Sequence, residues 1–353
     1  MAHDGMADGQ EPRRGGTARR VFGVLLIGVG VFGIVMAFVF PFVIVPHSKK
    51  TPLDLDITQR SSGPAKLLDP KTNTLQNVQL RATRVVKTDS KYSNDTDTTV
   101  NETLCIVKVV GNTPDCTKDS RLLSLTTDRV TANRKSGEAV HVAGWNENVN
   151  GKSVRHTGLS YKFPIDTEKK TYQFYEPDLT AAFPATYQGT EKVKGLKTYK
   201  FVSNTGQQKY KLFGTIAGFY TDTRTVWVEP QTGTIVKGTE HQVQNLGDAN
   251  GKPGQLALDT TLSFEDSAIT YQTNYAKSKI DDLKLAGVWA PLACGIVGLL
   301  ALVGAFLLLG RRRRPATGGD GGQHRPGGGP GDGPDDGSDY DPNYSPFAGS
   351  THT

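Results

Sequence analysis

The sequence predicts a mainly β protein, in which a single antiparallel β-barrel or sandwich-like domain lies outside the membrane between two transmembrane helices. Two observations predict the helices: residues 21–45 and residues 285–310 are apolar and contain no charged side chain. The third observation concerns residues 46–284, where short runs rich in Val, Ile, Thr, Tyr and Phe alternate with polar residues and end at Gly, Asn, Asp or Pro. Such runs are typical of antiparallel strands.

Both apolar segments are longer than the about 20 residues that cross a bilayer as a helix. A backbone in hydrocarbon must satisfy its own hydrogen bonds, which favours helices for both. Four arginines precede the first segment, so a cleaved signal peptide is the alternative to an anchor. The apolar run is long for a signal peptide, and residues 46–50 (PHSKK) contain no small-x-small cleavage site. We therefore expect an uncleaved anchor.

The arginines also predict the orientation of the chain. Four of them lie before the first span and four follow the second span at 311–314. Because basic flanks stay in the cytoplasm, residues 1–20 and 311–353 are predicted to be cytoplasmic and residues 46–284 extracytoplasmic, in a plasma-membrane protein of the cell envelope. The tail at 311–353 is rich in Gly, Pro and Asp and is predicted to be disordered, with residues 340–347 as a possible docking strip.

Cysteine usage agrees with this topology. Cys105 and Cys116 lie in the outer segment, where thiols can oxidise, and Cys294 lies inside the second span. The pair flanks a polar turn and has no histidine nearby in the sequence, so we expect a disulfide that closes a hairpin or loop rather than a metal site. The net charge of +6 is not gathered in one basic patch, which argues against nucleic acid as a partner.

Several strands can be placed directly from the pattern. A hairpin is expected where residues 223–228 and 234–243 flank a turn in which Pro230 fixes φ and Gly233 supplies the permissive position. Near the end of the outer domain, Ser267 is expected to cap a helix that leads into the second span. The other clear strands are residues 78–86, 104–110, 122–130, 171–175 and 196–202.

An antiparallel sheet of this size is expected to close into a barrel or pack as a sandwich, because open edges pair with other chains. The interior of such a sheet next to a bilayer can hold or pass a lipid chain. The candidate apolar lining, at alternate strand positions, is Tyr161, Phe163, Tyr172, Phe174 and Tyr175. Ordinary core packing is the alternative for these residues.

Small residues recur inside both spans. Gly28, Gly30 and Gly33 match the spacing of a dinucleotide-binding loop, but they lie in a membrane helix, so the match is accidental. Small residues let helices approach closely. We expect these glycines, together with Ala290, Cys294 and Gly298 in the second span, to pair the two spans of one chain or the spans of two copies in a homo-oligomer.

Chemistry-bearing motifs are sparse. His141, His156 and His241 are far apart in the sequence and lack the spacing of metal ligands on a helix. No serine lies in a nucleophile elbow. The sequence therefore predicts a protein that is not an enzyme, with no catalytic residue, metal or cofactor.

Four segments resemble the actinobacterial PorA-like porin family, a family of cell-envelope membrane proteins with a domain of unknown function. They are HTGLSYKFPIDTEKKTY at 156–172, YQGTE at 187–191, GLKTYKF at 195–201 and WVEPQTG at 227–233, and the resemblance extends over about residues 20–313. It implies a channel. The strands depart from a membrane barrel, because Lys108, Arg121, Arg129 and Lys200 interrupt any apolar belt.

The topology also resembles the scavenger-receptor class B family, which has an anchor at each end and a β-rich outer domain. That resemblance implies lipid binding or passage. We therefore expect a non-enzymatic envelope protein that binds or conveys membrane lipid or another apolar envelope molecule. A porin or channel component and an envelope scaffold are the alternatives.

Overall fold

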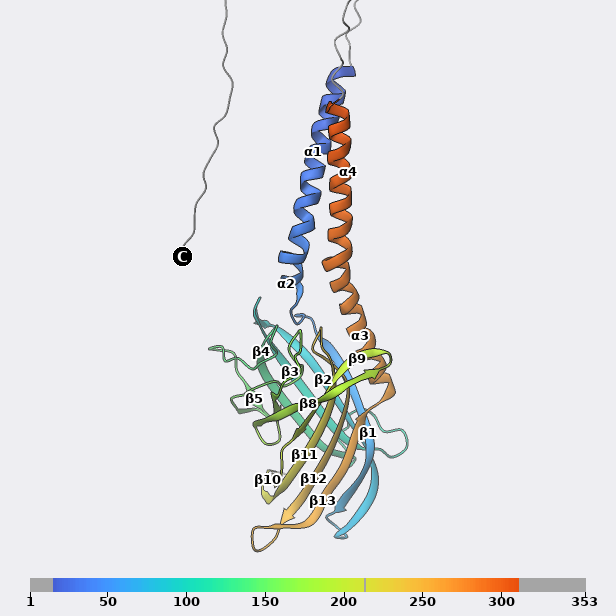
Figure 1. Cartoon of the computed structure of the whole chain (residues 1–353). Coiled ribbons are helices and arrows are strands. Elements are labelled where there is room, and N and C mark those ends of the chain that lie inside the picture. Colours follow the sequence, from blue (N-terminus) through green and yellow to red (C-terminus); the bar gives the residue numbers. More distant parts are fainter. Residues whose placement is uncertain (1–14, 213, 311–353) are drawn as a thin grey trace, which may run out of the picture. The chain divides into compact units, whose positions relative to one another are not determined.

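The computed structural model describes residues 15–212 and 214–310, and the predictions for the tail at 311–353 lie outside them. The described residues form one antiparallel sheet with a helical segment at each end of the chain (Figure 1). The prediction of a mainly β domain between two apolar helices is confirmed.

The sheet has the spatial order β6-β5-β4-β3-β2-β1-β13-β12-β11-β9-β8-β7, with β10 paired to β11. Each predicted strand overlaps one of these elements, although the strand predicted at 104–110 ends at Lys108 and the one predicted at 171–175 begins at Tyr172. The bounds are β1 (Asp56–Asp69), β2 (Thr74–Ser93), β3 (Asp97–Lys108), β4 (Leu122–Asn133), β5 (Asn148–Val149), β6 (Lys152–Ser153), β7 (Tyr172–Glu176), β8 (Ala181–Val193), β9 (Leu196–Asn204), β10 (Gln208–Leu212), β11 (Ile216–Glu229), β12 (Thr234–Gly247) and β13 (Pro253–Phe264).

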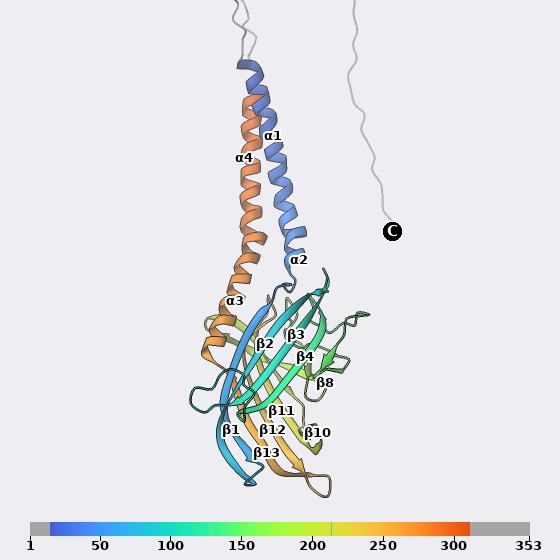
Figure 2. The same cartoon turned by 180° about the vertical axis from the view of Figure 1, so that it is seen from behind.

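The sheet is curved but does not close into a barrel. Within the described residues, only single-residue bridges connect its β4 side to β7. Ala132 pairs with Ala139, Glu138 with Leu159, and Leu159 with Phe174. Of the two arrangements that the sequence left open, the closed barrel is therefore not formed. The curvature places the inner faces of β1–β3 and β11–β13 around the same space (Figure 2).

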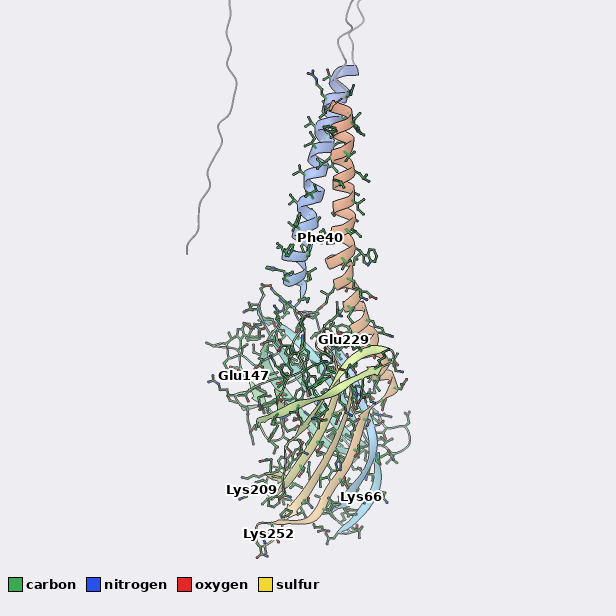
Figure 3. All side chains as sticks on the ribbon, in the orientation of Figure 1. Phe40, Lys66, Glu147, Lys209, Glu229 and Lys252 are labelled. Carbon is green, nitrogen blue, oxygen red and sulfur yellow. A yellow bond between two sulfur atoms is a disulfide. The ribbon has the colours of Figure 1, made fainter. Side chains whose placement is uncertain are left out.

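The β11–β12 hairpin shows how the sequence sets a turn. The backbone N–H of Gly233 donates to the Glu229 carbonyl at 2.9 Å, and Gly233 has φ of 71°, which a glycine adopts without strain. The Glu229 carboxylate accepts hydrogen bonds from the backbone N–H groups of Gln231 (3.0 Å) and Thr232 (2.8 Å). Glu229 lies at the end of the sheet nearest the helices, and Lys66 and Lys252 lie at the opposite end (Figure 3). We call the former the helix-proximal end.

The helical segments contain π turns where prolines disturb them. The first runs through α1 (Gly15–Val39), η1 (Phe40–Ile44) and α2 (Val45–Ser48), and the second through α3 (Asp266–Lys284), η2 (Leu285–Trp289) and α4 (Ala290–Gly310). Pro41 lies in η1 and Pro291 follows η2. A proline lacks the N–H donor and clashes with the carbonyl four residues earlier, which a wider π turn accommodates.

Residues Thr17–Ser48 and Asp266–Gly310 are long and apolar enough to cross a membrane, each with a mean hydropathy of 2.7 in its most apolar window. Most large side chains of α1 and α4, such as Phe22, Phe32, Leu300 and Phe306, are exposed. In water that exposure would be unfavourable, whereas lipid chains match these side chains.

α1 and α4 pack directly on each other through small residues. A Cβ added at Gly33 would lie 2.7 Å from the Cys294 carbonyl oxygen and 2.9 Å from the Gly298 Cα. A Cβ at Gly298 would lie 2.8 Å from the carbonyl oxygen of Gly30. Gly28 has no neighbour of this kind within 4 Å, and Ala290 is only partly buried. The close approach is therefore between the two helices of one chain.

This geometry predicts opposite outcomes for two similar substitutions. Gly33→Leu should destabilise the α1–α4 pair by about 1–3 kcal/mol, because the side chain meets backbone that cannot move aside. Gly28→Leu points into open space and should change stability by less than about 0.5 kcal/mol. Thermal unfolding of both variants in the same detergent would measure the difference, and equal midpoints would contradict this packing.

Cys105 and Cys116 form a disulfide, as predicted. Cys105 lies on β3 and Cys116 in the connection to β4, so the bond closes the loop between two neighbouring strands. An ion pair between Arg60 of β1 and Asp115 holds the same loop on the sheet. The free thiol of Cys294 remains in α4.

The predicted cap of α3 is wrong by two positions. The N-cap residue is Glu265, which has extended backbone angles and whose carbonyl accepts a hydrogen bond from the Ile269 N–H at 3.0 Å. Ser267 lies inside the first turn. Glu265 is held at this point because its own N–H donates to the Arg60 carbonyl of β1 at 3.0 Å. That tertiary bond ends β13 and fixes the start of the helix.

Candidate functional site

A cavity lies between the two halves of the curved sheet, and we call it the sheet cavity. Its volume is about 490 Å³, which is within the range of ligand pockets. Aliphatic and aromatic side chains cover much of both walls. On the β1–β3 wall they are Ile57, Ala82, Val86, Leu104 and Ile106; on the β11–β13 wall they are Val226, Ile235, Leu262 and Phe264.

The register of the strands explains the first wall. Ile57, Gln59 and Ser61 alternate along β1 and point into the cavity. Their partners on β2 across the ladder are Val86, Arg84 and Ala82. On β3, Leu104 lies opposite Arg84 and Ile106 lies opposite Ala82, so both also face the cavity. Because side chains alternate between faces of a strand, this register alone gathers the apolar side chains on the inner face.

The cavity extends to the helix-proximal end. There it is bounded by Pro52 in the link after α2, by Tyr275 and Leu283 of α3, and by Ala286 of η2. The same helix is held on the sheet by Ala276, which packs with Trp227 and Val236. The lining of the sheet cavity therefore reaches the base of the helical pair, where Lys49, Lys279 and Asp282 lie beside these apolar side chains.

One part of the lining is charged, and we call it the Arg224 cluster. Arg224 on β11 pairs with Glu176 (2.7 Å), Glu240 (3.1 Å) and Asp222 (3.7 Å). Arg224 and Glu240 line the cavity, and Arg84 lines it from the opposite wall. Arg84 in turn pairs with Glu102 at 3.4 Å. Most of these side chains are shielded from solvent, so each charge depends on its partners.

The acids of this cluster outnumber the arginines. Burial, with the neighbouring carboxylate of Glu240, raises the pKa of Asp222 to about 9, and burial likewise raises the pKa of Glu102. Burial, together with Glu176, raises the pKa of nearby Asp178 to about 7. Burial opposes the charge on Arg224, but the carboxylates around it, Glu240 first, hold its pKa well above its ordinary value. Some of these carboxyl groups, Asp222 among them, therefore keep their proton at neutral pH.

A lysine lies in the lining at the helix-proximal end. Lys162 follows Tyr161, and both residues border the sheet cavity. Its Nζ donates a hydrogen bond to Thr51 Oγ1 at 2.9 Å. Thr51 is itself buried and bonded to the Arg134 carbonyl at 2.8 Å. Burial lowers the pKa of Lys162 to about 7.

The structure divides the five aromatic residues that were candidates for an apolar lining. Tyr161 and Phe174 border the sheet cavity. Phe163 and Tyr172 pack with Phe201 in the core between β7, β9 and β11. Tyr175 is buried against the ring of His156, 4.5 Å away between centroids. For Phe163, Tyr172 and Tyr175 the observed role is packing beside the cavity.

Two of the three histidines come together, which their separation in the sequence did not predict. His141 Nδ1 lies 2.6 Å from Glu147 Oε1, and His156 Nδ1 lies 3.2 Å from the other oxygen of the same carboxylate. His156 Nε2 lies 2.7 Å from Asp128. Burial opposes protonation of His156, but hydrogen bonds and charge from Asp128 and Glu147 outweigh it and raise its pKa. His241 is apart, next to Asp259.

Within residues 15–212 and 214–310, no group of three or more His, Cys, Asp or Glu side chains has a metal-binding arrangement. Arg224, Glu240 and Lys162 have no signal in the sequence that marks them as cavity residues. An arginine or a lysine in the middle of a polar run carries no local mark of burial. Asp222 and Arg224 are assigned to the inner face only because they lie at two-residue spacing from Tyr220 and Val226 on β11.

The fold and the cavity define a membrane or cell-envelope protein whose β-rich domain is built around an internal cavity. Comparison with known families then identifies the group. The family described as Porin PorA matches residues 22–307, and the chain belongs to this family. The resemblance of the four sequence segments is thereby confirmed.

Two curated relatives carry the name Porin PorA. The protein of Corynebacterium amycolatum is 22% identical over 379 residues, which cover 82% of this chain and 98% of the relative. The protein of Corynebacterium resistens is 25% identical over 288 residues, which cover 56% of this chain and 70% of the relative.

Proposed function

We propose that this envelope protein takes an apolar chain of a membrane amphiphile into the sheet cavity and binds or conveys it. The sheet cavity carries this proposal, because its largely apolar walls reach the base of two apolar helices. A lipid chain that enters there would pass from one apolar environment to another. Burial of each CH₂ group away from water is worth about 0.8 kcal/mol.

The proposed topology places the β domain outside the cytoplasmic membrane, with both ends of the chain in the cytoplasm. The antiparallel packing of α1 on α4 brings the two spans side by side, as two passes through one bilayer require. The Cys105–Cys116 disulfide supports an oxidising compartment for the β domain. Exposed Trp289, at the junction of η2 and α4, suits the interface between lipid and water.

A channel is the second candidate, because both curated relatives are named as porins. The polar part of the lining, with Arg84, Arg224 and Glu240, would favour ions over lipid if it continued through the domain. Each of these charges already has a partner, Glu102 for Arg84 and Glu240 for Arg224. The apolar side chains nearer the helix-proximal end, such as the cross-strand pair Ile57 and Val86, favour lipid. An envelope scaffold has no comparable support, and homo-oligomers through the spans and the absence of enzymatic activity stay predictions.

A substitution that fills part of the sheet cavity tests this proposal. Ala82→Phe should place a ring among the apolar rows and lower the amount of lipid that copurifies with the full-length protein in detergent at least several-fold, as measured by mass spectrometry. Leu125→Phe adds the same ring at an exposed position of β4 and should leave the lipid unchanged. Finding no lipid with the unaltered protein, while that protein passes ions in a planar bilayer, would reverse the ranking in favour of the channel.

A further inference from the structure

Lys162 differs from the other lysines at the helix-proximal end because it has no acidic partner within the described part of the chain. Lys49 pairs with Asp166 at 2.8 Å, and Lys50 pairs with Asp95 at 2.7 Å. Lys279 lies 3.9 Å from Asp282. Lys162 Nζ has the Thr51 hydroxyl as its hydrogen-bond partner, and among residues 15–212 and 214–310 no carboxylate forms an ion pair with it. This cation borders the sheet cavity without a matching acid.

An ammonium group that is withdrawn from water without an anion is costly. In this chain the cost appears as the lowered pKa of Lys162, whose single cause is burial. The neighbouring Tyr161 hydroxyl is also buried, with no hydrogen-bond partner among the described residues. Both residues border the sheet cavity, and the Lys162 ammonium has donor capacity left after its bond to Thr51. An anion that reaches Lys162 Nζ would supply the missing counter-charge.

The deeper charges do not offer an equivalent site. Arg224 is already surrounded by Glu176, Glu240 and Asp222, and the acids around it are in excess. An incoming anion would meet carboxylates there. Acids are in excess at the Arg224 cluster, whereas the unpaired Lys162 lies at the helix-proximal end. An anion would therefore bind at the end of the sheet cavity next to the helices.

We propose that the ligand of the sheet cavity is a long-chain amphiphile with a single anionic head group, carboxylate or phosphate, which pairs with Lys162 while the chain lies between the β1–β3 and β11–β13 walls. This inference rests on the proposed function. It identifies the class of molecule, because a neutral lipid would leave Lys162 unpaired. It also explains why a basic residue is placed within an apolar lining at the end that lipids reach first.

The test compares three probes with the same chain length: palmitate, hexadecyl phosphate and hexadecanol. Binding to the full-length protein in a neutral detergent is measured for the unaltered protein, for Lys162→Met, and for the control Lys66→Met on the exposed side of β1. We expect at least one anionic probe to bind about 10- to 100-fold more tightly than hexadecanol, as a charged hydrogen bond predicts. Lys162→Met should remove that preference and leave hexadecanol binding unchanged, and Lys66→Met should alter neither.

The outcomes separate the two proposals. Equal binding of hexadecanol and both anionic probes by the unaltered protein would overturn the role of Lys162 and leave lipid binding standing. A preference that survives in Lys162→Met would overturn it as well. Binding of none of the three probes would remove the proposed function itself. Unchanged hexadecanol binding shows that Lys162→Met is folded, and Lys162→Arg, which keeps the charge, should retain the preference. Which anionic probe binds more tightly identifies the head group as carboxylate or phosphate.

Discussion

Replacing Arg224 with methionine is expected to destabilise the β domain by about 3–5 kcal/mol, which is the usual cost of removing one partner from a buried ion pair. Arg224 is the counter-charge of Glu176 and Glu240, and no other arginine lies within ion-pairing distance of these two acids in the described chain. Its removal leaves carboxylates from β7 and β12 facing each other across the inner face. Urea unfolding in detergent, followed by the fluorescence of buried Trp227, would measure the loss.

The size of this loss should depend on pH. The pKa of Asp222 is raised to about 9 and that of Asp178 to about 7, so the folded protein holds protons that the unfolded chain releases near pH 4. Stability carried by such groups is present at low pH and declines as the pH rises towards the folded pKa. Without the positive charge of Arg224, the pKa values of these acids in the folded protein should rise further. The difference between Arg224→Met and the unaltered protein should therefore be larger at pH 7 than at pH 5.

A surface pair provides the control for this prediction. Arg121 pairs with Asp119 in an exposed loop, and solvent screens that interaction. Arg121→Met should leave the stability nearly unchanged at either pH. If Arg224→Met resembled Arg121→Met, or if its effect were greater at pH 5, the buried cluster would not have the electrostatic role assigned here.

The parts of the structure that the sequence predicted are those with a local signal. A charge-free apolar run is visible in any window of the chain, so both helical segments were placed within a few residues. The hairpin at Pro230 and Gly233 follows from turn chemistry within five residues. The Cys105–Cys116 disulfide required only two thiols on either side of a polar turn. Each of these features depends on residues that are close in the chain.

The parts that were missed depend on pairing between distant segments. β1 contains Gly63 and Pro64, which weaken a strand pattern, yet it lies in the middle of the sheet. Gly63 is required because a Cβ there would lie 1.9 Å from the Thr261 carbonyl oxygen of β13. The acids around Arg224 come from β7, β11 and β12, and their meeting has no signature within one strand. His141 and His156 meet at Glu147 because the short β5–β6 hairpin brings Glu147 beside His156.

The same limit explains why the aromatic lining was only partly predicted. Alternation shows which residues share a face, but it does not distinguish a side chain that packs against its neighbours from one that borders an empty space. Phe163 has no exposed surface and contacts Tyr172, Phe174 and Phe201, with ring centroids 5.4, 5.7 and 4.7 Å away. Phe174, two residues along β7 from Tyr172, reaches the cavity from the same cluster.

Phe163→Ala should consequently cost about 3–5 kcal/mol of stability, because a ring is lost from a core whose neighbours are fixed on β7, β9 and β11. Tyr271→Ala, at a half-exposed position of α3, should cost less than about 1 kcal/mol. Measuring lipid binding shows whether Phe163 only packs in the core or also lines the cavity. At a temperature where Phe163→Ala remains folded, the affinity of this variant for a long-chain probe should equal that of the unaltered protein. A stable Phe163→Ala variant with weakened lipid binding would instead place this ring in the path of the ligand, and the boundary between core and cavity drawn from these distances would be wrong.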